Sequence, residues 1–149
     1  MVEQNLTAAP MIIAPHAADA DGQVLRGSTL VVQDWPAQGT ATEVAPMHVH
    51  YADDEAWHVI SGALLFRFQQ ADLIVRAGST LLVPAGVAHT FGNAGPARSR
   101  FLIILPARLD ALIAELHQSS PGDHAAIYRK YQSELLDGES GPGTTRARP

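Results

Sequence analysis

The chain has 149 residues, 46% of them hydrophobic, which supports one domain with a buried core and excludes an intrinsically disordered class. The formal net charge is −5 without a Lys/Arg cluster, which argues against a nucleic-acid partner. No apolar run reaches transmembrane length and the start lacks a signal-peptide pattern, so we expect no membrane contact; the absence of cysteine fits a cytoplasmic protein.

Most of the chain consists of short apolar or β-branched segments separated by turns that contain Gly or Pro. The expected strands are residues 11–14, 24–33, 40–50, 55–60, 63–68, 73–76, 80–83, 88–91 and 98–105. Short strands at this regular spacing predict an all-β sandwich or barrel. Gly62 suits a hairpin turn with positive φ, and Pro84 and Gly86 fit positions i+1 and i+3 of a type I turn.

After Pro106 the hydrophobic period changes from that of strands to that of helices. The apolar residues that recur at helical spacing are Leu109, Leu112, Ile113 and Leu116, followed by a second set of Ile127, Tyr131 and Leu135 after a cap at Asp123. We therefore expect a barrel with an N-terminal strand over residues 1–105. A two-helix extension of the same domain should cover residues 106–137, and a flexible tail residues 138–149.

Three histidines and one glutamate stand out among the expected strands. His48 and His50 are two residues apart, so one strand projects both from the same face. Glu55 begins the next strand, and His89 follows the tight corner at Pro84. Three imidazoles and one carboxylate on short β-type segments are a donor set that can hold one divalent transition metal ion.

The two segments that carry these residues resemble the two motifs of the cupin superfamily. Residues 48–62, HVHYADDEAWHVISG, are similar to the first motif, and residues 78–93, GSTLLVPAGVAHTFGN, match the second. Thr42 stands where the family's opening Gly would be, which affects no ligand. The resemblance implies a double-stranded β-helix, or jelly roll, over roughly residues 24–105. It also implies that His48, His50, Glu55 and His89 are the metal ligands.

Such a site would leave one or two positions open on a five- or six-coordinate ion. Three neutral imidazoles and one carboxylate leave a divalent ion with one net positive charge, which favours an anionic oxygen ligand such as an enolate or phenolate. Imidazole and carboxylate accept Fe, Mn, Ni, Co, Cu and Zn, so the metal stays open. Glu55 is the candidate catalytic residue, either as a ligand alone or as a general base.

Strand alternation predicts the walls of a substrate pocket. If Glu55 points inward, side chains in phase with the ligands and on the last strand should line it, namely Trp57, Val59, Phe91, Phe101 and Ile103. An apolar and aromatic lining suits a planar hydrophobic molecule better than a sugar phosphate.

Other polar residues near the motifs have simpler interpretations. We expect His58 to face outward and Asp53 and Asp54 to be solvated in their loop. His16, His117 and His124 lie outside the motifs and should be surface or helix residues. Tyr128 and Tyr131 fit amphipathic packing better than acid catalysis.

The helical extension makes the chain resemble small single-domain cupins akin to quercetin dioxygenases. This resemblance implies a metal-dependent dioxygenase that takes a small enol or phenolic (flavonol-like) substrate and dioxygen. A cyclase or isomerase that uses the metal as a Lewis acid, and a non-enzymatic small-molecule-binding module, remain as alternatives. Cupins commonly pair, and the apolar residues 11–13 suit an exchanged strand, so we also expect a homodimer.

Overall fold

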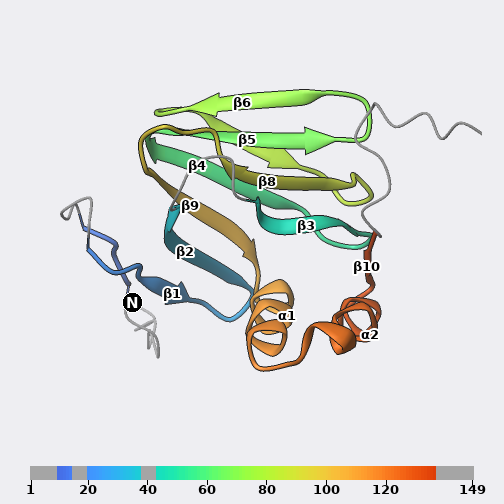
Figure 1. Ribbon diagram of the computed structural model, residues 1–149. Coiled ribbons are helices and arrows are strands. Elements are labelled where there is room, and N and C mark those ends of the chain that lie inside the picture. Colours follow the sequence, from blue (N-terminus) through green and yellow to red (C-terminus); the bar gives the residue numbers. More distant parts are fainter. Residues whose placement is uncertain (1–9, 15–19, 38–42, 137–149) are drawn as a thin grey trace, which may run out of the picture.

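The computed structural model describes residues 10–14, 20–37 and 43–136, and its strands form two antiparallel sheets (Figure 1). The first sheet has the order β1-β2-β9-β4-β7, made of Val24–Arg26, Leu30–Ala37, Ser99–Pro106, Glu55–Ser61 and Thr80–Val83. The second has the order β10-β3-β8-β5-β6, made of Ser133–Leu135, Glu43–His50, His89–Asn93, Ala63–Phe68 and Asp72–Arg76. The predicted jelly-roll class is therefore confirmed.

The core lies between the two sheets and follows the alternation of each strand. In β4 the side chains of Glu55, Trp57 and Val59 are buried, whereas those between them are more exposed. Aromatic rings from both sheets meet edge to face, as in the pair Trp57 and Phe66, whose centroids are 5.0 Å apart. The inward side of β4 is thus fixed by its period of two, and this period also carries Glu55 into the barrel.

Two helices follow β9 and lie together at one end of the molecule (Figure 1). Helix α1 (Ala107–His117) begins directly after β9, and a short 3₁₀ turn (Pro121–Asp123) leads into α2 (His124–Lys130). Both helices add side chains to the same buried cluster as the barrel, namely Leu109, Leu112, Ile127 and Tyr128. Neither helix has the length and apolar character needed to cross a membrane.

The second helix is shorter than the hydrophobic period suggests. We expected Leu135 on the helix face with Ile127 and Tyr131, but α2 ends at Lys130 and Gln132 takes a φ of +53°. This turn allows residues 133–135 to form β10, which pairs antiparallel with β3. The extension therefore contributes an edge strand to the second sheet as well as two helices. The tail expected at residues 138–149 lies outside the described residues.

Three smaller expectations were also wrong. The strand expected at residues 24–33 is two strands, because the chain turns back where the amide of Gly27 donates to the carbonyl of Leu30 at 2.8 Å. Residues 11–14 form no strand within this single chain. At the corner before β8, the Val87 amide donates to the Pro84 carbonyl, so Pro84 is position i and Gly86 is position i+2. The φ of +86° at Gly86 is typical of a type II turn.

Candidate metal centre

Strands β3, β4 and β8 bring the four predicted residues to one buried place, with His48 and His50 on β3, Glu55 on β4 and His89 on β8. Donor atoms of His48, Glu55 and His89 all lie within 4.8 Å of one another, which is close enough to share one ion. His50 falls outside that group, but its Nε2 is 3.4 Å from Oε2 of Glu55. Nε2 of His89 is 3.2 Å from the same oxygen.

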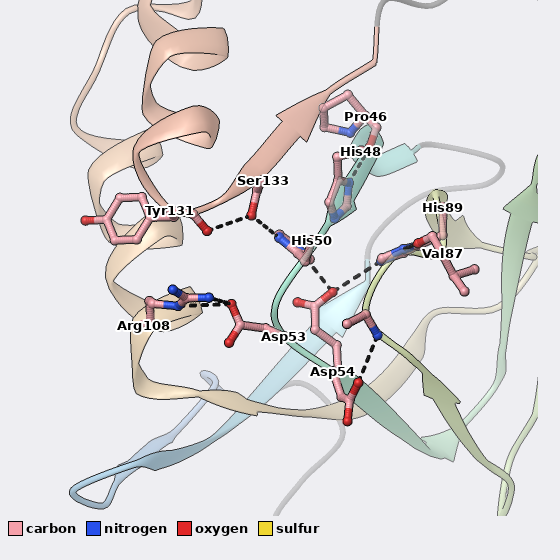
Figure 2. Close-up of polar contacts among 12 residues, drawn as sticks. Pro46, His48, His50, Asp53, Asp54, Val87, His89, Arg108, Tyr131 and Ser133 are labelled. Atoms are coloured by element: carbon pink, nitrogen blue, oxygen red, sulfur yellow. Dashed lines mark hydrogen bonds and ion pairs between the residues drawn. The ribbon is translucent and has the colours of Figure 1, made fainter.

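The Nδ1 atom of each histidine is held by a neighbour (Figure 2). Nδ1 of His48 is 2.7 Å from the carbonyl oxygen of Pro46, and Nδ1 of His89 is 3.0 Å from that of Val87. A carbonyl oxygen only accepts hydrogen bonds, so both Nδ1 atoms carry the proton. The Nε2 atoms of these two neutral imidazoles therefore have free lone pairs.

For His50 the proton is also placed on Nδ1, but the partner is the hydroxyl of Ser133 and not a backbone carbonyl. Oγ of Ser133 is 2.6 Å from Nδ1 of His50 and 3.1 Å from the carbonyl oxygen of Tyr131. Because the single hydroxyl proton goes to that carbonyl, Oγ must accept from Nδ1–H of His50. All three histidines are thus set in the tautomer that presents Nε2 for binding, an orienting role typical of the partners of metal-ligating histidines.

Two donor atoms at the centre of the group are left unpaired by the described residues. Oε2 of Glu55 and Nε2 of His89 are buried and have no hydrogen-bond partner among the described residues. A carboxylate lone pair facing imidazole lone pairs at 3.2–3.4 Å is unfavourable until a cation joins them. Nitrogen and oxygen donors of this kind suit a divalent transition metal, so the residues present fit the ion that the sequence predicts.

Burial and charge move the pKa values of the site in ways that also suit a metal ion. Burial lowers the pKa of His48 to about 4, helped by His89 and His50, so the imidazole is neutral at physiological pH. For Glu55, burial acts to raise the pKa, but when the neighbouring imidazoles carry a second proton, their hydrogen bonds and charge outweigh burial and lower the pKa to about 2. The carboxylate is therefore ionised whenever the histidines are free to bind.

A cavity of about 220 Å³ opens beside these residues, between the barrel and the two helices. Of the predicted wall residues, Trp57, Phe91 and Ile103 line it together with His48, His50 and Glu55. Val59 and Phe101 do not line it. Both point inward as the alternation required, but they lie among the fully buried side chains of the core.

The helices contribute cavity residues that sequence reasoning left out. The most prominent are Tyr128, whose ring centroid is 5.6 Å from that of His48, and also His117 and His124. Strand β2 adds Trp35, which was not predicted either. Burial raises the pKa of Tyr128 to about 12, with a further contribution from Glu55, so its phenol stays protonated. The spacing of His124 and Tyr128, four residues apart on one helix face, was a signal that could have placed both together.

The remaining polar residues near the motifs hold the loops in place. His58 faces away from the site, with Nδ1 2.9 Å from Thr80. The two aspartates are anchored rather than merely solvated. Asp54 accepts from the amide of Ala85 at 2.8 Å, and Asp53, whose side chain is only 10% exposed, pairs with Arg108 at 2.6 Å (Figure 2). His16 lies outside the described residues.

Comparison with known proteins agrees with this geometry. Residues 39–105 match the family model described as a cupin domain. A double-stranded β-helix protein from Klebsiella pneumoniae is 25% identical, with a TM-score of 0.51 over 63% of this chain and 77% of that one. A cupin protein from Bacteroides fragilis has a TM-score of 0.55 at 16% identity, over 67% of this chain and 84% of that one.

No curated protein matches the chain. The family match covers β3 to β9, the strands that carry all four predicted ligands. The matched motifs, the two-sheet fold and the buried His and Glu group agree with one another, and residues 39–105 match a cupin domain, as the sequence resemblance predicted.

Proposed function

We propose that this protein is a metal-dependent, dioxygenase-like enzyme that acts on a small enol or phenol. The observation that carries the proposal is the common tautomer of the three histidines, each fixed by an independent neighbour. Donor atoms of His48, Glu55 and His89 lie within 4.8 Å of one another beside the cavity, and Nε2 of His50 lies 3.4 Å from Oε2 of Glu55. His48, His50, Glu55 and His89 would hold one divalent Fe, Mn, Ni, Co, Cu or Zn ion.

When bound, the ion would supply Lewis-acid chemistry and, if redox-active, electron-transfer chemistry. The protein's own part begins with the cavity wall. Trp57, Phe91 and Ile103 give an aromatic and aliphatic surface that suits a planar ring and keeps water away from it. The one net positive charge of the centre favours an anionic oxygen on that ring, which points to an enol or phenol.

The geometry favours one of the two roles open to Glu55. A pKa of about 2 makes its carboxylate a good ligand and a weak proton acceptor. To act as a general base, the carboxylate would have to turn away from His50 and His89, because these neighbours hold its pKa low. We therefore propose that Glu55 acts first as a ligand.

Oxygen consumption tests the reaction. Protein purified without a metal-affinity column is assayed for metal content and then for oxygen uptake with flavonols and simpler enols. Uptake that depends on the loaded metal and is lost in Glu55→Gln would support the proposal. Turnover under nitrogen would indicate Lewis-acid isomerase or cyclase chemistry instead, and tight binding without turnover under any metal would indicate a binding module.

We also propose a homodimer in the cytoplasm. Ile12 is 78% exposed and Met11 is also exposed, so this apolar segment is available for pairing with a second copy. Light scattering at micromolar concentration should give the dimer mass, and a sharp monomer peak would contradict the dimer. Cell fractionation tests the location.

A further inference from the structure

Helix α2 places one tyrosine in the cavity and leaves the other outside it. Tyr128 is 4% exposed and lines the cavity. Tyr131 is three residues further along, and its hydroxyl donates to Oε2 of Glu115 at 2.8 Å. Within the described residues the hydroxyl of Tyr128 makes no such hydrogen bond, and only burial and the charge of Glu55 act on it.

Although Tyr128 is 4% exposed as a residue, its hydroxyl oxygen is not one of the fully enclosed polar atoms that lack a partner, so a water or a ligand in the cavity can reach it. The ring of Tyr128 is fully used in packing, since it lies 5.6 Å from the ring of His48 and stacks at 16° to that of His50. Phenylalanine would fill the same space. The oxygen of Tyr128 therefore has no hydrogen-bond partner among the described residues and is open to a molecule that enters the cavity.

The surroundings define that partner. The polar side chains of the cavity wall are those of His48, His50, Glu55, His117 and His124, and the remaining wall is largely apolar. Of these, the rings of His48 and His50 lie against the ring of Tyr128. The phenol keeps its proton, so it acts as a hydrogen-bond donor. A donor beside a cation is suited to an anionic oxygen, because a charged acceptor makes the stronger hydrogen bond.

We infer that Tyr128 is a substrate-contacting residue whose hydroxyl donates a hydrogen bond to the anionic oxygen of an enolate or phenolate held beside His48 and His50. This inference rests on the proposed function and deepens it, because it assigns selection of an oxygen anion to helix α2. The side chain positions the ligand through its hydrogen bond and does not change its own protonation state.

The test uses the full chain loaded with Co²⁺ and two probes that differ in the property at issue. The first probe is 4-nitrocatechol, which presents phenolate oxygens, and the second is imidazole, which presents a nitrogen and no anionic oxygen. Visible absorption gives both affinities and the affinity for Co²⁺ itself. The variants are Tyr128→Phe and the matched control Tyr131→Phe, whose hydroxyl bonds Glu115 away from the cavity.

We expect Tyr128→Phe to weaken 4-nitrocatechol binding about tenfold, the loss of one hydrogen bond to a charged group. Its affinities for imidazole and Co²⁺ should stay unchanged, and Tyr131→Phe should behave as the natural protein. Equal 4-nitrocatechol binding in Tyr128→Phe would overturn the inference. So would an equal loss for both probes, or a loss of folding, since either would show a structural role inside the fold.

A wrong metal centre and a wrong role for Tyr128 would give different results. If the natural protein binds no Co²⁺, the proposed metal centre is wrong and the role of Tyr128 is wrong with it. If Co²⁺ binds and the two 4-nitrocatechol affinities agree, the metal centre stands and only the role of Tyr128 is rejected.

Discussion

Ser133 accepts a hydrogen bond from Nδ1 of His50 at 2.6 Å, although 83 residues separate the two in the chain. The serine lies on β10, and β10 pairs with β3 so that Ser133 stands opposite His50. The last described strand thus orients a predicted metal ligand that lies in the first half of the chain.

Replacing Ser133 with Ala should therefore weaken metal binding. Without the acceptor, the His50 ring loses the contact that fixes its tautomer, and partners of this kind are worth roughly 10- to 100-fold in metal affinity. Competition with a chelating dye measures the change. Ser119→Ala is the matched control, because its hydroxyl donates to the carbonyl of Glu115 outside the site. Equal affinities in the two variants would contradict the orienting role.

Replacing Arg108 with Gln should destabilise the loop that joins His50 to Glu55. The guanidinium binds Asp53 in the loop before Glu55, and also Gln132, which precedes Ser133. Its loss leaves the carboxylate of Asp53 poorly solvated and should lower the free energy of unfolding by about 1–2 kcal/mol. Arg26→Gln is the control, since Arg26 makes an exposed pair with Asp110 on the same helix. Urea unfolding gives the free energy of unfolding of both variants. Equal decreases would contradict the prediction, because they would trace the effect to lost contacts of helix α1 and not to the loop before Glu55.

Replacing Glu55 with Gln should move stability and metal binding in opposite directions. In the metal-free protein, the amide can donate to the Nε2 lone pairs of His50 and His89, where the carboxylate finds no donor among the described residues. The melting temperature of the metal-free protein should rise. Metal affinity should fall more than about 100-fold with the loss of the anionic ligand. A drop in both quantities would show that Glu55 is needed for folding rather than for metal binding.

The metal-free protein should lose stability as the pH falls from neutrality. The folded pKa of His48 is about 4 against 6.5 for the free side chain, so the unfolded chain binds more protons between these values. The free energy of unfolding should fall across pH 6.5 to 4 by roughly 3 kcal/mol. For Glu55, with a pKa of about 2, a further loss is expected as the pH falls from 4.5 towards 2.

Chemical unfolding in the presence of a chelator at pH 7 and pH 4 measures this dependence. His48→Gln should flatten the part between pH 6.5 and 4, because glutamine does not titrate. His58→Gln is the control, since His58 bonds Thr80 away from the site. An unchanged slope in His48→Gln would assign the acid sensitivity to other groups.

The barrel and the predicted ligands could be found from the sequence because their signals are local. Strand alternation places Glu55, Trp57 and Val59 on one side of β4. The turn before His89 is predicted by Pro84 and Gly86. Alternation predicts that a side chain points inward, but it does not predict whether that side chain reaches the cavity or the closed core. Phe101 and Val59 share the inward direction of the cavity residues but lie in the closed core.

The helical extension was harder to predict because its contacts are distant in sequence. Strand β10 has three residues and acquires its identity from pairing with β3. Tyr128 and Tyr131 belong to one helical pattern, and only the packing of α2 against the barrel places Tyr128 in the cavity and directs the hydroxyl of Tyr131 to Glu115. No periodicity in one segment contains that information.

The pairing of β10 with β3 also means that the barrel depends on the C-terminal extension for an intact metal centre. A shortened chain that stops at Pro106 would keep every predicted ligand and lose an edge strand, the orienting hydroxyl of Ser133 and the guanidinium that ties down the ligand loop. Metal release and detachment of the C-terminal segment should therefore be coupled events, and transplanting the four ligands alone into another jelly roll would not reproduce the centre.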